Sequence, residues 1–94
     1  MHFNREPRFL LTCRLWISTD GGNTFHDALS INISRVGVGF YSARRFEAGT
    51  PILARSNHFS KDREGIVRWN IKINEELWRM GVQFLPGGGG PGKL

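Results

Sequence analysis

The stretch Leu29–Phe40, LSINISRVGVGF, places an apolar residue at every second position on both sides of a short polar break. The apolar residues are Leu29, Ile31 and Ile33 before the break and Val36, Val38 and Phe40 after it. A period of two is typical of β-strands, because neighbouring side chains of a strand point to opposite faces. The stretch therefore predicts a strand, a sharp bend and a second strand, with one apolar face.

The opposite face of this hairpin carries no charged side chain, which is unusual for a soluble sheet. Its residues are Ser30, Asn32 and Ser34, followed by Gly37 and Gly39. Short hydrogen-bonding groups beside positions without a side chain would let a flat or bulky partner lie against the backbone. The same residue types also build tight turns, so a purely structural role is the alternative.

The period of two continues through most of the chain and predicts six strands. They are expected near residues 9–18, 24–33, 36–43, 52–56, 65–73 and 78–84. Hairpins with one apolar and one polar face usually close into a small barrel, because closure removes exposed strand edges. The sequence therefore predicts an all-β fold, a six-stranded antiparallel β-barrel with little or no C-terminal helix.

The tryptophans divide between the two faces of these strands. The phase of the fifth strand places Trp69 on the apolar face with Ile71 and Ile73. The phase of the last strand places Trp78 there too, so core packing is the expected role of both tryptophans. Trp16 has the opposite phase and is a candidate surface aromatic. Because stacking platforms need several exposed rings, a barrel for single-stranded nucleic acid is the least favoured alternative.

Composition and charge describe one basic domain. The 94 residues include 13 Lys and Arg against 8 Asp and Glu, which gives a formal net charge of +5. Most of the cations are arginines, whose forked guanidinium pairs with phosphate and stacks on flat rings, so an anionic partner or simple solubility is expected. No run of about 18 apolar residues and no signal peptide is present, so we expect a cytoplasmic chain without membrane insertion.

No catalytic or metal-binding set of residues stands out. Cys13 is the only cysteine, which excludes an internal disulfide and a zinc-finger site, and it is expected to be a small core residue. The segment GGGGPGK at 87–93 matches the Walker A spacing but lacks the hydroxyl residue and the following helix. The sequence therefore predicts no enzyme, no metal and no cofactor, and a flexible Gly-rich tail at 87–94.

The segment N-I-S-R-V-G at 32–37 resembles the [D/N]-x-S-x-x-G motif of PilZ domains, which are bacterial receptors for cyclic di-GMP. Three further segments resemble later parts of the family pattern in the family's order: AGTPI at 48–52, GIVRW at 65–69 and MGVQF at 80–84. This order of elements is more specific than any one motif. The resemblance implies a PilZ-type barrel over residues 1–86 with an N-terminal arginine arm at 1–8.

The resemblance also implies a site for cyclic di-GMP. In the family, arginines of an R-x-x-x-R segment grip phosphates and guanines, the Asp or Asn and the Ser of the second motif bind a guanine, and its Gly allows close approach. The expected ligand-binding residues here are Arg5, Arg8, Asn32, Ser34, Arg35 and Gly37. The arginine segment departs from the pattern, because residues 5–8 read R-E-P-R, one residue short. This departure bears on affinity rather than on fold.

These observations predict a non-enzymatic receptor or adaptor that binds cyclic di-GMP and couples it to an unidentified partner protein. By resemblance, the outputs are motility, adhesion, pili or exopolysaccharide secretion. A nucleic acid polymer is not an expected partner. The alternative, favoured by the shortened arginine segment, is a PilZ-like protein interaction module without the ligand. The helix common at the C-terminus of the family is missing after Phe84, and a homodimer or pairing with another domain is the hypothesis that follows.

Overall fold

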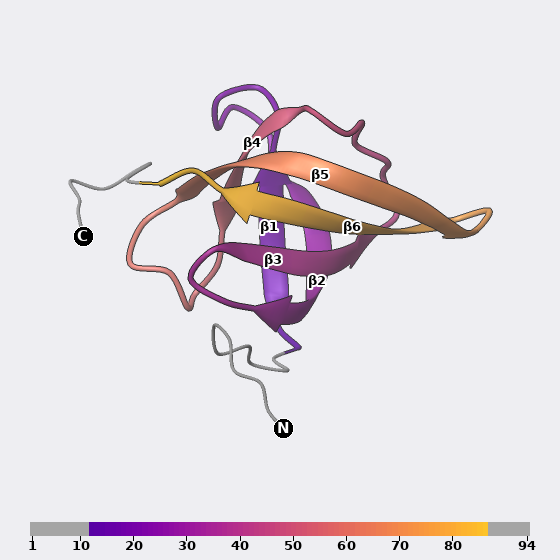
Figure 1. Cartoon of the computed structure of the whole chain (residues 1–94), viewed down its shortest axis with the longest axis horizontal. Helices are drawn as coiled ribbons and strands as arrows, with labels where there is room; N and C mark the ends of the chain where they lie inside the picture. The colour runs from indigo at the N-terminus through magenta and orange to yellow at the C-terminus, as the bar shows by residue number, and fades with distance from the viewer. Residues whose placement is uncertain (1–11, 87–94) are drawn as a thin grey trace.

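The computed structural model describes residues 12–86, which form a closed barrel of six antiparallel strands (Figure 1). The strands are β1 (Arg14–Ser18), β2 (His26–Ile33), β3 (Gly37–Ser42), β4 (Pro51–Arg55), β5 (Arg63–Asn74) and β6 (Leu77–Phe84). The predicted six-stranded antiparallel barrel is confirmed. The described part of the chain contains no helix, and so none that could span a membrane. The arginine arm and the Gly-rich tail lie outside the described residues.

The strands follow the order β1-β2-β3-β6-β5-β4 around the barrel, so the segment between β3 and β4 must cross one of its ends. Phe46 of this crossing loop is buried, and its backbone N–H donates to the sulfur of Met80 over 3.4 Å. The side-chain amide of Asn70 donates to the carbonyl of Phe46 over 2.9 Å. The loop therefore closes this end of the barrel and attaches to β5 and β6.

The core fills the barrel with side chains from all six strands. Its buried apolar residues are Leu15, Ile17, Ala28, Ile33, Val38, Phe40, Phe46, Ile52, Ala54, Val67, Met80, Val82 and Phe84. The phases predicted for β1, β3 and β6 are confirmed by this set. Cys13 is partly buried and packs against the core, as expected, and so does Trp78. Trp16 is half-buried on β1, with the Arg14 guanidinium 6.0 Å from its ring centre.

The predicted phase of β2 is wrong at its centre because a β-bulge lies between Ser30 and Asn32. Ser30 is 2% exposed rather than outward, and Leu29 is 47% exposed rather than inward. The Ser30 hydroxyl accepts a hydrogen bond from the Cys13 N–H over 2.9 Å, which satisfies it inside the barrel. Since a bulge adds one unpaired residue, it reverses the phase on one side, and Ile33 returns to the core.

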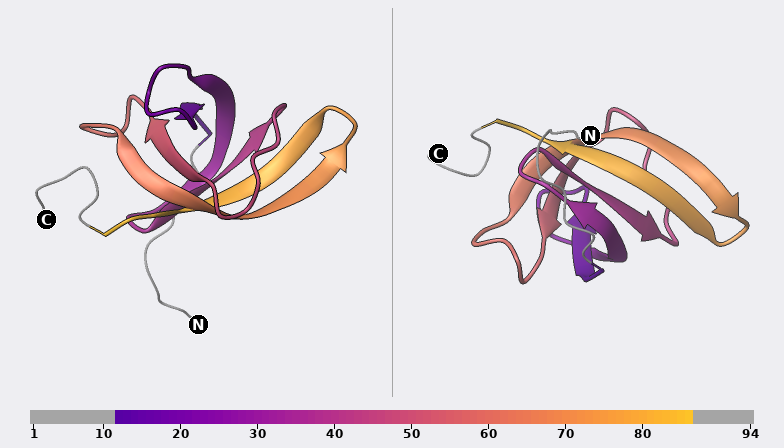
Figure 2. Two further views of the ribbon diagram at one scale, coloured as in Figure 1. Left: turned by 90° about the horizontal axis from the view of Figure 1, so that it is seen from above. Right: turned by 60° about the horizontal axis from the view of Figure 1, so that its bottom comes forward.

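The predicted phase of β5 is wrong beyond Val67 for the same reason. Register shifts occur between Val67 and Trp69 and again between Lys72 and Asn74. Trp69, Ile71 and Ile73 were expected in the core, but they are 40%, 53% and 47% exposed. The distal half of the β5–β6 hairpin extends past the other strands (Figures 1 and 2). There is thus no barrel interior for these side chains to enter.

Candidate functional site

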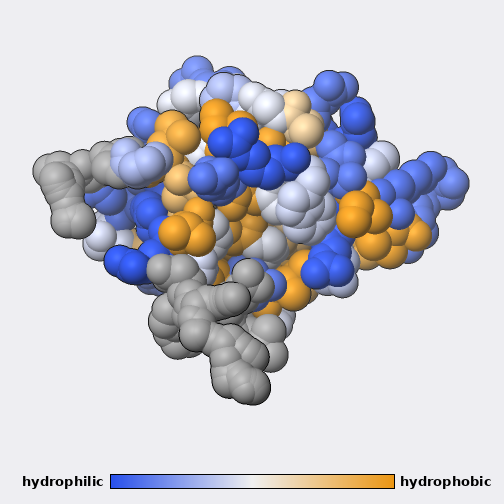
Figure 3. Space-filling view, viewed as in Figure 1, coloured by the Kyte–Doolittle hydropathy of each residue, from blue (hydrophilic) through white to orange (hydrophobic). Residues whose placement is uncertain are grey.

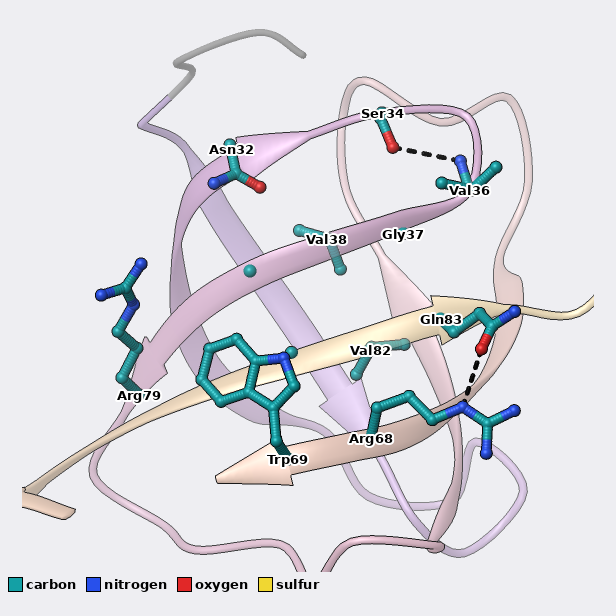
Figure 4. Close-up of a pocket in the computed structure, with 12 residues that line it drawn as sticks. Asn32, Ser34, Val36, Gly37, Val38, Arg68, Trp69, Arg79, Val82 and Gln83 are labelled. Carbon is teal, nitrogen blue, oxygen red and sulfur yellow. Dashed lines mark hydrogen bonds between the residues drawn. The ribbon is translucent and has the colours of Figure 1, made fainter. Parts of the chain in front are cut away.

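An open groove of about 380 Å³ crosses the outer face of β2, β3, β6 and β5 (Figure 4). The first two strands and their turn contribute Asn32, Ser34, Gly37 and Gly39, and the last two contribute Arg68, Trp69, Arg79, Gly81 and Gln83. A groove of this volume can hold a small organic ligand. Within residues 12–86, no group of three or more His, Cys, Asp or Glu side chains is arranged to hold a metal ion.

Four residues form a row across the groove, one from each strand. Asn32 pairs with Gly39, Gly39 pairs with Gly81, and Gly81 pairs with Trp69. Adjacent strands lie about 4.8 Å apart, so the two glycines form a floor between an amide on one side and an indole on the other. In this glycine floor Gly81 is buried and Gly39 is partly exposed, so a flat group that enters between Asn32 and Trp69 (Figure 4) would meet the backbone at Gly39.

The indole of Trp69 lies directly over Gly81. A Cβ atom at Gly81 would collide with Cε2 and Nε1 of the indole, so only glycine leaves room for the ring in this position. Aromatic side chains that cover a cross-strand glycine are a known means of stabilising β-sheets. The bulge before Trp69 turns its side chain to the outer face, and the indole remains 40% exposed there. Its position over the sheet is therefore well defined while part of its surface stays open.

The groove carries positive charge. Arg68 and Arg79 line it, and no Asp or Glu is among the described residues that do. The Arg68 Nε–H donates to the side-chain carbonyl of Gln83 over 2.7 Å, which fixes that guanidinium at one end (Figure 4). At the other end, the guanidinium carbon of Arg79 is 5.9 Å from the Trp69 ring centre. The Nε of Arg79 is buried and has no hydrogen-bond partner within the described chain. The groove thus suits an anionic ligand.

Ser34 has both roles that were considered for the polar face, because it helps to close a tight turn and it also lines the groove. Its hydroxyl accepts a hydrogen bond from the Val36 N–H over 3.2 Å, and its N–H donates to the Gly37 carbonyl over 2.9 Å. These bonds close the turn between β2 and β3. Val36, expected on the apolar face, lies in this turn and is 54% exposed. Ser34 therefore shapes the turn and also lines one end of the groove.

Gly37 and Gly39 differ in the space around them. A Cβ atom at Gly37 would collide with the carbonyl oxygen of Val82 on β6, whereas at Gly39 the nearest atom would be Asn32 Oδ1 at 3.5 Å. Gly37 does not have the positive φ that favours glycine. The glycine of the motif is thus needed because β3 and β6 approach closely. Gly39, by contrast, lies under the open groove.

We expect Gly37→Ala to lower the free energy of unfolding by about 1–3 kcal/mol, the usual cost of overpacking against a fixed backbone. Gly39→Ala is the matched control, because its methyl group meets only ordinary van der Waals contacts. This control should change the free energy of unfolding by less than about 1 kcal/mol. Urea unfolding curves measure both variants. Equal midpoints would show that close strand approach is not what Gly37 provides.

The structure brings three of the expected site residues together and separates one. Asn32, Ser34 and Gly37 line the groove, but Arg35 is exposed in the turn and is not among the lining residues. The backbone carbonyl of Arg35 accepts a hydrogen bond from the Arg63 guanidinium over 3.2 Å. Burial lowers the pKa of Arg63, whose guanidinium carbon is 4.1 Å from the centre of the Phe84 ring.

Two expected site residues, Arg5 and Arg8, lie outside the described residues. The sequence did not identify Trp69, Arg79 and Gly81 as parts of the site, although Gly39 was recognised as outward. A usable signal existed in the segments GIVRW and MGVQF, which contribute the tryptophan and the glycine that the tryptophan covers. The bulge hid this signal, because alternation without a bulge assigns Trp69 to the core.

Comparison with known proteins gives a family and a fold. A family model described as the PilZ domain matches residues 3–90. The solved structure of the Bacillus subtilis inhibitor of motility, MotI/DgrA, is similar to this chain with a TM-score of 0.64 and 18% sequence identity. The match covers 89% of this chain and 43% of MotI/DgrA, so the chain spans less than half of that protein. No curated protein matches the sequence.

Proposed function

The chain belongs to the PilZ domain family, and from this premise we propose that it is a cytoplasmic, non-enzymatic receptor for cyclic di-GMP. The ligand would bind in the groove and couple to a partner protein. The observation that carries the proposal is the row of Asn32, Gly39, Gly81 and Trp69, a flat floor between an amide and an indole. Two guanines and two phosphates are the groups that this site must accommodate.

The groove offers a complementary group for each part of the ligand. A guanine that lies on the glycine floor can stack against the indole of Trp69, because every base has a π-face. The amide of Asn32 has both donors and an acceptor for the edge of that base. Arg79 at one end of the groove can pair with a phosphate, since guanidinium and phosphate form charge-assisted hydrogen bonds. Arg68 is already held by Gln83 and contributes mainly its charge.

The arginine arm at 1–8 would supply the remaining cations. Arg5 and Arg8 would close over the phosphates from above the groove, and the ordered arm would form a new surface for the partner protein. Motility, adhesion, pili and exopolysaccharide secretion are the outputs that the family suggests. Arg35 is exposed and does not line the groove, so in this proposal it would lie at the rim of the assembly.

Calorimetric titration of the whole chain with cyclic di-GMP tests the proposal, with GMP as the comparison ligand. We expect saturable binding in the micromolar range or tighter, and much weaker binding of GMP. The absence of heat up to about 100 µM cyclic di-GMP would contradict the proposal and favour the ligand-free interaction module.

The variant Arg79→Ala tests whether the described groove takes part. We expect it to weaken binding by roughly tenfold, because it removes a charge-assisted contact to phosphate at a partly exposed position. Arg44→Ala, at an exposed position in the crossing loop outside the groove, is the matched control and should bind as the wild type does. Equal affinities of the two variants would exclude Arg79 from the site.

A further inference from the structure

The hairpin of β5 and β6 has a strand edge that no described strand covers. β5 pairs with β6 along residues 65–74 but with β4 only along residues 63–66. The last backbone hydrogen bonds along the β4 side of β5 join Val67 to Gly49 and Thr50. From Trp69 onward, the backbone groups on this side face no strand within residues 12–86. Free strand edges of this kind are templates for pairing with another chain.

Apolar side chains cluster on this free edge. Trp69, Ile71 and Ile73 lie along it, with Ile73 at the register shift between Lys72 and Asn74, and they are 40%, 53% and 47% exposed. They are three of the five large hydrophobic residues that are exposed in the described chain. Figure 3 shows the hydrophobic surface on the projecting hairpin, apart from the other hydrophobic areas of that face. An edge with free backbone groups and exposed apolar side chains combines the two requirements for strand addition.

We propose that residues 69–73, the β5 edge, pair with the same edge of a second copy of the chain. The pair would be antiparallel and centred on Ile71, with a twofold axis perpendicular to the sheet. This register places Trp69 opposite Ile73 of the second copy and Asn70 opposite Lys72. Every apolar residue of the edge then faces an apolar residue, and the interface is isologous, as in most symmetric dimers.

The charge pattern selects this register over its neighbours. An antiparallel pair centred on Asn70 would put Arg68 opposite Lys72, and one centred on Lys72 would put Lys72 opposite itself. Like charges directly opposite one another destabilise a strand pair. Only the register centred on Ile71 avoids both contacts while keeping the apolar residues together. The edge is therefore complementary to itself in one arrangement.

The paired sheets would place both grooves on the same side of the dimer, because a twofold axis perpendicular to the sheet preserves its faces. Trp69 would then line its own groove and also pack beside Ile73 of the second copy. The dimer and the ligand site would share this one residue. The inference itself rests on the strand edge and does not depend on which ligand the groove binds.

Sedimentation of the whole chain over a concentration series, without ligand, tests the proposal. We expect a dimer that Ile71→Lys weakens by more than about tenfold, because this variant brings two like charges together at the twofold axis. Thr19→Lys is the matched control, since it adds the same charge at an exposed turn residue far from the hairpin, and it should dimerise normally. A wild-type chain that stays monomeric, or a dimer that persists in Ile71→Lys, overturns the proposal.

A mixture of two variants tests the register directly. Ile71→Lys and Ile71→Glu should each be largely monomeric, whereas an equimolar mixture should form a dimer with one copy of each. This rescue requires residue 71 of one copy to lie opposite residue 71 of the other. It also shows that both variants fold, because unfolded chains would not restore the dimer. A mixture that remains monomeric contradicts the register centred on Ile71.

Discussion

Replacing Arg8 by alanine is expected to reduce the binding of cyclic di-GMP below the detectable range. The described groove supplies two cations, and one of them, Arg68, already donates to Gln83. Two phosphates therefore require further cations, and the arm at 1–8 is the segment that the family pattern assigns to them. Loss of one hydrogen-bonded charge in a closed contact costs about 2–5 kcal/mol, which corresponds to roughly 30-fold or more in affinity.

The controls for Arg8→Ala separate charge from shape. Arg8→Lys keeps the charge but loses the forked geometry, so its affinity should fall between those of the wild type and the alanine variant. Urea unfolding of all three chains tells a loss of fold apart from a loss of binding. If Arg8→Ala bound cyclic di-GMP as tightly as the wild type, the arginine arm would have no role in binding and the proposed closure would be wrong.

Replacing Trp69 by alanine should weaken the binding of cyclic di-GMP by about five- to 150-fold. This range corresponds to the 1–3 kcal/mol that a base gains by stacking on an aromatic side chain. The variant should remain folded, since Trp69 lies on the outer face and is 40% exposed. Trp69→Phe keeps an aromatic face and should retain most of the affinity. Calorimetry with each variant measures the effect.

A second substitution removes the stack without removing the tryptophan. In Gly81→Ala, the new methyl group would occupy the place of the Trp69 indole and displace it from the floor. We expect this variant to lose affinity to a similar extent as Trp69→Ala. Trp16→Ala, on β1 and outside the groove, is the control that should bind normally. Wild-type affinity in both Trp69→Ala and Gly81→Ala would place the ligand away from the glycine floor.

The fold could be predicted from the sequence because the apolar period is intact in three strands. The core residues that lie where their phase requires are Leu15 and Ile17 on β1, Val38 and Phe40 on β3, and Met80, Val82 and Phe84 on β6. Alternation of this kind is a local property of the sequence. It gives the number of strands and their order along the chain. Closure into a barrel then follows from the need to cover the apolar face.

The errors in the predicted phases of β2 and β5 have one physical origin. Bulges in β2 and β5 each add one residue to a strand, and a single added residue reverses which side chains face the core. Ser30 and Trp69 were therefore assigned to the wrong faces. No Gly or Pro lies within the shifts at Ser30–Asn32 and Val67–Trp69 to mark either bulge in the sequence. The alternation alone could not place these residues.

The site was predictable only as far as it is local. Asn32, Ser34 and Gly37 lie within six residues of sequence, in and beside the turn between β2 and β3, so the motif identifies them. The row from Asn32 to Trp69 joins four strands, and its register depends on pairings between residues that are far apart in the chain. The glycine floor is thus a product of the tertiary structure, whereas the turn beside it is a product of the sequence.

A proton–nitrogen NMR correlation titration of the labelled chain with cyclic di-GMP tests the central claim most directly. The groove account predicts that the indole N–H of Trp69 and the backbone amides of Gly39 and Gly81 shift in a saturable way. The amides of the β1–β2 turn, such as Gly21, should stay in place. Saturable shifts confined to other parts of the barrel, or no shifts at all, would contradict the assignment of the groove as the cyclic di-GMP site.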